Sequence, residues 1–278
     1  MTTATQLTEE ATSSYVDAGG NQVHYNEAGT GSVVIMLHGS GPGASSWSNF
    51  APRNLAPLSA KHRVLLVDQL SYGKTDSVIL TEPGERARSV RDLMDALHIE
   101  KASLVGNSMG GGTALNFTVA YPERVEKLIL MGSGGGGGGS LFGHTPSEGI
   151  KVVNETHENP TPENFRRMFD VMLYDASSIG DDVLKARSEA AQASPHHQEA
   201  RRKSSALSRD LSPSLPNITA PTLILHGRDD RVVPMEGSVR LVGLIPNSRL
   251  VIFNHCGHWI QYEHADEFNR LVLDFLAH

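Results

Sequence analysis

The stretch LVGNSMGGG, residues 104–112, holds a serine between two glycines in the pattern G-x-S-x-G. The pattern directly follows a short apolar run and leads into a helical pattern. This context is typical of a nucleophile elbow, where small flanking residues permit a sharp turn that exposes the serine hydroxyl. Ser108 is therefore the candidate nucleophile. The amide N–H of Met109, at the start of the expected helix, is a candidate donor to a developing oxyanion.

A serine nucleophile needs a histidine as its base and a carboxylate that orients the histidine. After an elbow, the acid precedes the histidine in the chain. His258 in NHCGHW lies between the last apolar run and the final helical pattern, where the base is expected, and His255 is its nearest rival. The segment HGRDDRVVP, 226–234, offers both Asp229 and Asp230 as the acid, and spacing does not choose between them.

A second oxyanion donor is expected from the loop HGSGPGASSWSNF, residues 38–50. Its glycines at 39, 41 and 43 let the backbone approach a substrate closely. The loop also follows the carboxyl end of an expected strand, where the sites of α/β proteins form. We therefore expect the Ser40 amide to join the Met109 amide.

These residues need a scaffold, and the chain alternates short apolar runs with longer helical patterns. The runs are near-continuously hydrophobic, as strands buried on both faces of a parallel sheet must be. Strands are predicted at 33–38, 63–68, 102–107, 127–132, 221–227 and 249–254, and helices at about 85–98, 109–121, 235–244 and 263–277. A hairpin with its turn at Gly19, Gly20 and Asn21 is expected ahead of them.

The alternation stops for almost ninety residues between the strands predicted at 127–132 and 221–227. Amphipathic patterns at 163–175 and 181–193 fill part of this stretch, and a structureless loop of that length is uncommon. We predict a core made of 1–133 and 213–278, with a helical cap at 134–212. Six glycines, Gly134–Gly139, stand at the junction, either as a hinge or as a side-chain-free wall of the site. His196 and His197 are expected to be solvated.

The length, charge and cysteine content of the chain narrow the class of protein further. A chain of 278 residues is near the upper limit of about 250–300 for one hydrophobic core. The net charge of −7 argues against a nucleic-acid partner. No apolar run approaches the ~20 residues of a membrane span. The single cysteine, Cys256, and an N-terminus without signal-peptide features predict a cytoplasmic protein.

Two cofactor readings are disfavoured. The glycines of 39–43 suggest dinucleotide binding, but Asp68, about thirty residues on, comes late for a ribose-binding acid. His255, Cys256 and His258 suggest a metal site, but a fourth ligand at the usual spacing is missing. We expect neither a metal nor an organic cofactor.

Together these motifs resemble the α/β-hydrolase fold and, within it, the meta-cleavage product hydrolases, serine enzymes of bacterial aromatic degradation that cleave carbon–carbon bonds. The resemblance covers nearly the whole chain after about residue 14. Its narrower parts are HGSGPGASSWSNF, the SLF…PSEG segment and CGHWIQYEHADEFNRLVLDFL. It implies an α/β fold with a mostly parallel eight-stranded sheet flanked by helices and a helical cap inserted after the sixth strand.

The resemblance also implies roles for single residues. The family's nucleophile, base and acid correspond to Ser108, His258 and Asp230, and its oxyanion amides to Ser40 and Met109. Its substrate-binding positions correspond to Gly41, Asn49, Asn107, Met172, Arg187, Val232 and Trp259. Arg187 is the residue implied to pair with the substrate's carboxylate, and Met172 and Val232 lie where some relatives carry bulky aromatics near the acyl pocket.

The implied substrate is a small molecule, a 2-hydroxy-6-oxohexa-2,4-dienoate with an aryl or alkyl group at C6. Hydrolysis gives 2-hydroxypenta-2,4-dienoate and a carboxylic acid. A carboxylesterase or related acyl hydrolase would share the same three catalytic residues and is the main alternative. A ligand receptor that keeps the pocket without the chemistry is a second. Relatives commonly form homo-oligomers, so a dimer or higher assembly is expected.

Overall fold

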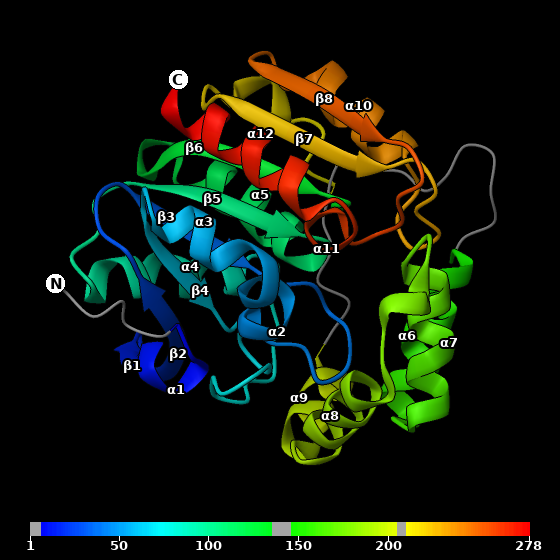
Figure 1. Ribbon diagram of the computed structural model, residues 1–278. Helices are drawn as coiled ribbons and strands as arrows, with labels where there is room; N and C mark the ends of the chain where they lie inside the picture. Colours follow the sequence, from blue (N-terminus) through cyan, green and yellow to red (C-terminus); the bar gives the residue numbers. More distant parts are fainter. Residues whose placement is uncertain (1–6, 135–145, 205–209) are drawn as a thin grey trace, which may run out of the picture.

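The computed structural model describes residues 7–134, 146–204 and 210–278, and these build a central eight-stranded sheet (Figure 1). The strands lie in the order β1-β2-β4-β3-β5-β6-β7-β8. Their bounds are β1 Ser13–Ala18, β2 Asn21–Ala28, β3 Val33–Leu37, β4 Arg63–Val67, β5 Ala102–Asn107, β6 Val125–Met131, β7 Thr222–Gly227 and β8 Ser248–Phe253. The pairs β1·β2 and β2·β4 are antiparallel and the others parallel, which confirms the predicted hairpin and the mostly parallel sheet.

Helices cover both faces of the sheet because the strands are apolar on both sides. In β3, Ile35 and Leu37 pack into one core cluster, whereas Val34 and Met36 pack into the other. The first face carries α4 (Glu85–Ala96), α5 (Met109–Ala120) and α10 (Glu236–Leu244). The second carries α2 (Ser46–Phe50), α3 (Ala56–Ser59) and α12 (Ala265–Ala277). This double burial explains why the central strands read as continuous hydrophobic runs.

Short helical segments complete these elements. They are α1 Glu9–Thr12, the π-helical turn η1 Ala51–Leu55, the 3₁₀ turns η2 Pro122–Arg124, η3 Ala176–Ser178 and η4 Leu215–Asn217, and α11 Ile260–Glu263. The helix predicted at 263–277 corresponds to α12, which begins at Ala265, and the separate short helix α11 precedes it.

Between β6 and β7, the residues that the structure describes form four α-helices: α6 Glu148–Glu158, α7 Pro162–Met172, α8 Asp181–Gln192 and α9 Pro195–Lys203 (Figure 1). Side-chain oxygens of Ser147 and Thr161 cap α6 and α7, and Pro162 occupies the first turn of α7. The apolar faces of α6, α7 and α8 pack together in a separate hydrophobic cluster, which Val232 and Trp259 join. The amphipathic patterns at 163–175 and 181–193 correspond to α7 and α8.

One expectation within these helices is wrong. His197 is buried, and its ring contacts the Ser77 hydroxyl and the Gly73 carbonyl. It is buried because α9 packs on the loop that follows β4, a contact between segments more than 100 residues apart. Of the glycine run, Gly134 is exposed. Gly135–Gly139 lie outside the described residues, and so the prediction that the run forms a hinge or a wall of the site stays a prediction.

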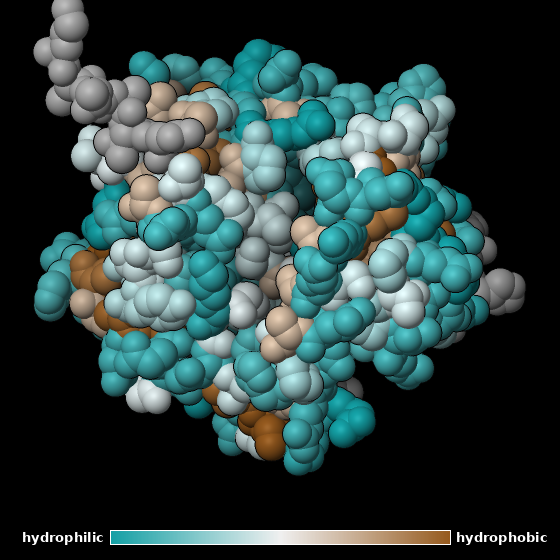
Figure 2. Space-filling model, turned by 60° about the horizontal axis from the view of Figure 1, so that its bottom comes forward, coloured by the Kyte–Doolittle hydropathy of each residue, from teal (hydrophilic) through white to brown (hydrophobic). Residues whose placement is uncertain are grey.

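None of the described helices is long and apolar enough to cross a membrane. The face turned forward in Figure 2 is mostly hydrophilic, and its hydrophobic residues form small separate patches.

Candidate active site

Ser108 lies at the sharp turn between β5 and α5. Its backbone has φ 54° and ψ −115°, a conformation that side-chain-bearing residues rarely adopt and that clusters at functional sites. The turn needs its two glycines, because a Cβ on Gly106 would lie 2.4 Å from the Gly110 carbonyl oxygen and one on Gly110 would lie 2.1 Å from that of Leu37. The Ser108 amide donates to the Met131 carbonyl at 2.8 Å, which ties the turn to β6.

The end of β7 brings a carboxylate to a histidine. Asp230 Oδ2 lies 2.7 Å from His258 Nδ1, and both side chains are 1% exposed. Since a carboxylate accepts, Nδ1 carries the proton and Nε2 is left to accept one. The backbone of His258 is held by α7, because its amide donates to the Met172 carbonyl at 2.6 Å. In the described chain no hydrogen bond joins His258 to Ser108 Oγ, a contact that often forms only with substrate bound.

Neighbouring groups keep Asp230 ionised. Burial alone would raise the pKa of this carboxyl, but His258, His226 and backbone amides hold it below its ordinary value. Asp230 Oδ1 accepts from the amides of Val232 and Val233 at 2.7 and 3.0 Å. His226 Nε2 lies 3.4 Å from Oδ2 on the other side.

Asp229 and His255, the alternatives that the sequence left open for the acid and the base, lie in different surroundings from Asp230 and His258. Asp229 accepts from the Cys256 amide at 3.3 Å and pairs with the half-exposed Arg228, so it faces away from His258. His255 is exposed and packs on the Tyr174 ring. Burial, followed by nearby carboxylates, raises the pKa of the Cys256 thiol, so this cysteine stays protonated.

The oxyanion loop is fixed from three directions. The Ser40 carbonyl accepts from His157 Nε2 at 2.7 Å and from the Tyr72 hydroxyl at 3.2 Å. The Gly39 carbonyl accepts from His38 Nδ1 at 2.7 Å. In the described part of the chain the amides of Ser40 and Met109 donate to no protein group, so both are available to a ligand oxygen.

One cavity gathers most of the predicted site. It is lined by Ser40, Gly41, Asn49, Asn107, Ser108, Met172, Arg187, Val232, His258 and Trp259, together with Gly39, Ala44, Ile150 and Val153. Met109 lines the adjoining cavity instead, and Asp230 lies behind His258. Residues from α2, β5, α6, α7 and α8 and from the loops that follow β3, β7 and β8 thus meet at one place.

Arg187 is the main charged group of this cavity. Its side chain is buried, and Nη1 donates to the Ser48 hydroxyl at 2.9 Å. Nε and Nη2 are buried without a partner among the described residues, and so is Asn107 Oδ1. Burial lowers the pKa of Arg187 to about 10, which leaves it charged at neutral pH. A buried cation with free donors is costly unless an anion joins it.

Sequence reasoning missed several residues that position this site. His157 reaches Ser40 from α6, Tyr72 reaches it from the loop after β4, and His226 flanks Asp230. Gly132 has φ +46°, and a Cβ there would lie 2.9 Å from His258 Nδ1. Of these residues, only Gly132, which follows KLILM, could have been singled out from the sequence.

A parallel sheet with a serine at the turn after β5 and a histidine–carboxylate pair beyond it defines a hydrolase of the α/β class. The family model for the alpha/beta hydrolase fold matches residues 32–265. A 2-hydroxy-6-oxo-6-phenylhexa-2,4-dienoate hydrolase of Comamonas testosteroni is 48% identical, over 98% of this chain and 99% of that protein. A 2-hydroxy-6-oxononadienedioate/2-hydroxy-6-oxononatrienedioate hydrolase of Paraburkholderia xenovorans is 47% identical, over 98% of each chain.

Solved structures agree. A meta-cleavage product hydrolase from Pseudomonas fluorescens IP01, complexed with acetates, superposes with a TM-score of 0.85 at 34% identity and covers 95% of this chain and 97% of its own. The 2-hydroxy-6-oxo-6-phenylhexa-2,4-dienoate hydrolase from Rhodococcus sp. strain RHA1 gives a TM-score of 0.84 at 27% identity, with 96% and 98% covered. The chain belongs to the α/β hydrolases and, within them, to the meta-cleavage product hydrolases, which confirms the resemblance.

The buried histidines predict how stability depends on pH. Burial lowers the pKa of His38 to about 4, so this ring binds a proton in the unfolded chain before it does in the folded one. The free energy of unfolding should therefore fall by roughly 2 kcal/mol from pH 7.5 to pH 5 through His38 alone. His157, whose pKa burial also lowers to about 4, acts in the same direction.

Urea unfolding across this pH range checks the prediction. His38→Gln, which cannot titrate, should show a shallower slope than the wild-type protein whatever its stability at pH 7.5. Equal slopes for the two proteins would show that His38 does not carry the effect.

Proposed function

We propose that Ser108, His258 and Asp230 form the catalytic triad of an enzyme that cleaves the C5–C6 bond of 2-hydroxy-6-oxohexa-2,4-dienoates. The products are 2-hydroxypenta-2,4-dienoate and the carboxylic acid that carries the C6 substituent. The activities of the two relatives from Comamonas testosteroni and Paraburkholderia xenovorans support this substrate class. The short distance between His258 and Asp230 and the sharp turn at Ser108 support the three roles.

The first step prepares a leaving group, because a carbon–carbon bond to an unsaturated carbon does not break as it stands. Arg187 binds the C1 carboxylate, and Asn49 and Asn107 contact the same end of the substrate. A proton moves from the 2-hydroxyl group to C5, which gives the 2-oxo tautomer. C5 can then leave with the bonding electrons as part of a delocalised dienolate.

The second step is acyl transfer. His258 takes the Ser108 proton while Oγ bonds to C6, and the oxyanion accepts from the Ser40 and Met109 amides. The C5–C6 bond breaks, its electron pair passes into the dienolate, and His258 returns the proton to the dienolate oxygen. His258 then removes a proton from water, which attacks the acyl-enzyme and releases the carboxylic acid and Ser108. Each oxyanion donor is typically worth about 3–4 kcal/mol.

Arg187 carries the proposal because it separates this reaction from its main alternative. A carboxylesterase needs the triad and the two amides, but it has no need of a buried guanidinium with free donors in the same cavity as Ser108. A dienoate brings the carboxylate that Arg187 lacks.

Arg187→Met tests the function. It should lower kcat/KM for a dienoate by about 10²–10³-fold, as expected when one partner of a buried ion pair is removed. Hydrolysis of a neutral ester such as p-nitrophenyl acetate should change less than about threefold, because that ester has no carboxylate. Loss of the dienoate absorbance and release of nitrophenol measure the two rates.

Lys185→Met is the matched control, because Lys185 stands on the exposed side of the same helix and lies 3.7 Å from Glu189. It should leave both rates unchanged. If Arg187→Met retained dienoate cleavage and the ester were the faster substrate of the wild-type enzyme, the esterase alternative would stand.

Three further expectations, on the cap, the cellular location and the assembly of the enzyme, accompany this proposal. Residues 134–212 form the cap, and the separate core of α6 to α8 supports that division. The enzyme is cytoplasmic, and it assembles as a homo-oligomer, as its relatives commonly do.

A further inference from the structure

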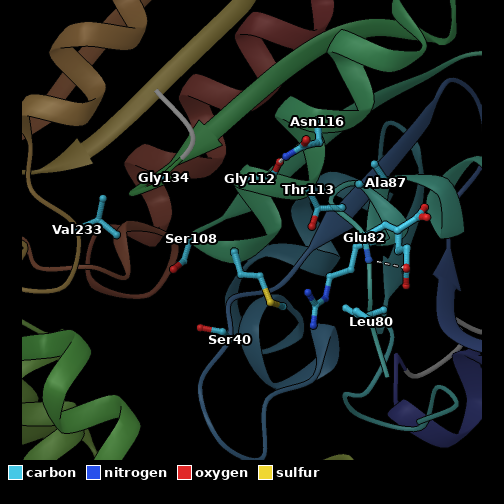
Figure 3. Close-up of a pocket in the computed structure, with 14 residues that line it drawn as sticks. Ser40, Leu80, Glu82, Ala87, Ser108, Gly112, Thr113, Asn116, Gly134 and Val233 are labelled. Carbon is cyan, nitrogen blue, oxygen red and sulfur yellow. Dashed lines mark hydrogen bonds between the residues drawn. The ribbon is translucent and has the colours of Figure 1, made fainter. Parts of the chain in front are cut away.

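A second cavity meets the first at Ser108 and has a volume of about 420 Å³. Ser40 and Ser108 line both cavities, whereas Leu80, Arg86 and Thr113 line only the second. Figure 3 shows Ser108 and Ser40 toward one side of it and Leu80 and Glu82 toward the other. A substrate carbonyl at Ser108 with its C1 carboxylate on Arg187 would place its C6 substituent in this second cavity.

Arg86, at the start of α4, is the one cationic side chain that lines the second cavity within the described residues. Its Nε is buried without a hydrogen-bond partner there, and no described carboxylate forms an ion pair with it. The guanidinium carbon lies over the Tyr72 ring, 5.9 Å from its centroid. Burial lowers the pKa of Arg86 and the nearby Arg201 adds to this, whereas Tyr72 and the Glu85 carboxylate oppose it without reversing its direction.

The surroundings make this end of the cavity more positive. Arg201 stacks on the same Tyr72 ring at 4.6 Å, so two guanidinium groups share one aromatic ring. The two glutamates that line the cavity are engaged elsewhere. Glu82 pairs with Arg88 at 3.4 Å, and Glu85 Oε1 accepts from the Thr81 amide and hydroxyl and from the Glu82 amide.

A purely apolar acyl pocket would have no use for such a group. Arg86 is half-buried, but its Nε is fully buried, and each unsatisfied buried donor of a native protein calls for an explanation. Guanidinium groups pair best with planar oxyanions, to which they can donate two parallel hydrogen bonds.

We propose that Arg86 binds a carboxylate carried by the C6 substituent, so that the preferred substrates are dianions with one carboxylate at each end. This inference rests on the proposed function. Arg187 would then hold the dienoate end and Arg86 the acyl end, with Ser108 between them. The acid released from the acyl-enzyme would be a dicarboxylic acid. Arg86 determines specificity here and does not touch the reacting atoms.

The test compares two dienoates that differ in charge at the acyl end. One is 2-hydroxy-6-oxonona-2,4-diene-1,9-dioate, with a carboxyethyl group at C6, and the other carries an uncharged propyl group there. Wild type should prefer the dioate by at least about tenfold in kcat/KM. Arg86→Met should lower kcat/KM by roughly ten- to a hundredfold for the dioate, mainly through KM, and by less than about threefold for the propyl substrate.

Two further variants complete the design. Arg91→Met removes another charge from α4, one that pairs with Asp92 and Asp95 and lines neither cavity, and should change neither rate by more than about twofold. Arg86→Lys keeps the charge and should recover part of the dioate preference. Inhibition by succinate should weaken in Arg86→Met, whereas inhibition by butyrate should not.

The outcomes separate the two proposals. A loss confined to the dioate supports the inference. An equal loss on both substrates, or no loss on either, overturns it while the proposed function stands. Failure of the wild-type enzyme to cleave either dienoate overturns the proposed function, and the inference with it.

Discussion

Replacing Ser108 with alanine should lower kcat for dienoate cleavage by about 10⁴–10⁶-fold, the range that removal of a serine nucleophile causes elsewhere. The change removes the Oγ that bonds to C6 and leaves the rest of the cavity in place. His258, Asp230 and the two oxyanion amides cannot replace it, because none of them can form the acyl-enzyme. Stopped-flow loss of the dienoate absorbance measures the rate.

Substrate binding should survive this change, since Arg187 and the cavity walls are untouched. Dissociation constants of wild type and variant for the product dienoate should therefore agree within about threefold. Ser59→Ala, on the outer helix α3, where the hydroxyl contacts only the Ala56 carbonyl, is the control and should keep full activity. More than about 1% residual activity in a freshly purified Ser108→Ala preparation would mean that another group attacks C6.

The result also addresses the receptor alternative. A ligand receptor on this fold would bind the dienoate with the same affinity before and after the change, and it would turn over none of it. Wild-type turnover that disappears in Ser108→Ala is incompatible with that class. The same variant therefore tests the nucleophile and the existence of the reaction.

The parts of the fold that were predictable are those with local causes. The strands β3 to β7 are apolar on both faces, so their runs mark a sheet covered by helices on both sides. The elbow could be found because its strain requires Gly106 and Gly110 at fixed spacing around Ser108. The order of acid and base along the chain follows from the order of the strand ends.

The parts that were not predictable depend on contacts between distant segments. His157 lies 117 positions from the Ser40 carbonyl that it holds. Arg86 gives the sequence pattern of an ordinary basic residue on a solvated helix, and only its place beside Tyr72 and the second cavity leaves its Nε buried without a partner among the described residues. Nor could the pattern of α6 show that its His157 reaches Ser40, because α6 lies inside the insert and the sequence does not indicate which loop of the core it packs on.

The sequence pattern also does not distinguish the two candidate acids, Asp229 and Asp230. Asp229 and Asp230 are adjacent and chemically the same, so composition and spacing treat them alike. The backbone after β7 decides, because the Asp230 amide donates to the Gly227 carbonyl and Oδ1 accepts from the amides of Val232 and Val233. This tight turn points Oδ2 at His258 and sends Asp229 to the Cys256 amide.

Asp230→Asn should accordingly lower kcat by about 10⁴-fold, whereas Asp229→Asn should cost less than about tenfold. An amide is nearly the same size as a carboxylate, so the loss would come from charge and hydrogen bonding. The neutral amide cannot stabilise the imidazolium that forms when His258 takes the Ser108 proton. Its NH₂ group, if turned toward Nδ1, would also favour the tautomer whose Nε2 is already protonated.

The pH profile distinguishes this cause from a general loss of structure. At high pH, hydroxide can assist deprotonation of Ser108, so the deficit of Asp230→Asn should shrink as pH rises, while its unfolding midpoint stays near that of Asp229→Asn. A deficit that is constant across pH and accompanied by a lower midpoint would show that Asp230 acts through the turn it caps. Equal losses in the two variants would remove the assignment of Asp230 as the acid, because only one of the two carboxylates contacts His258.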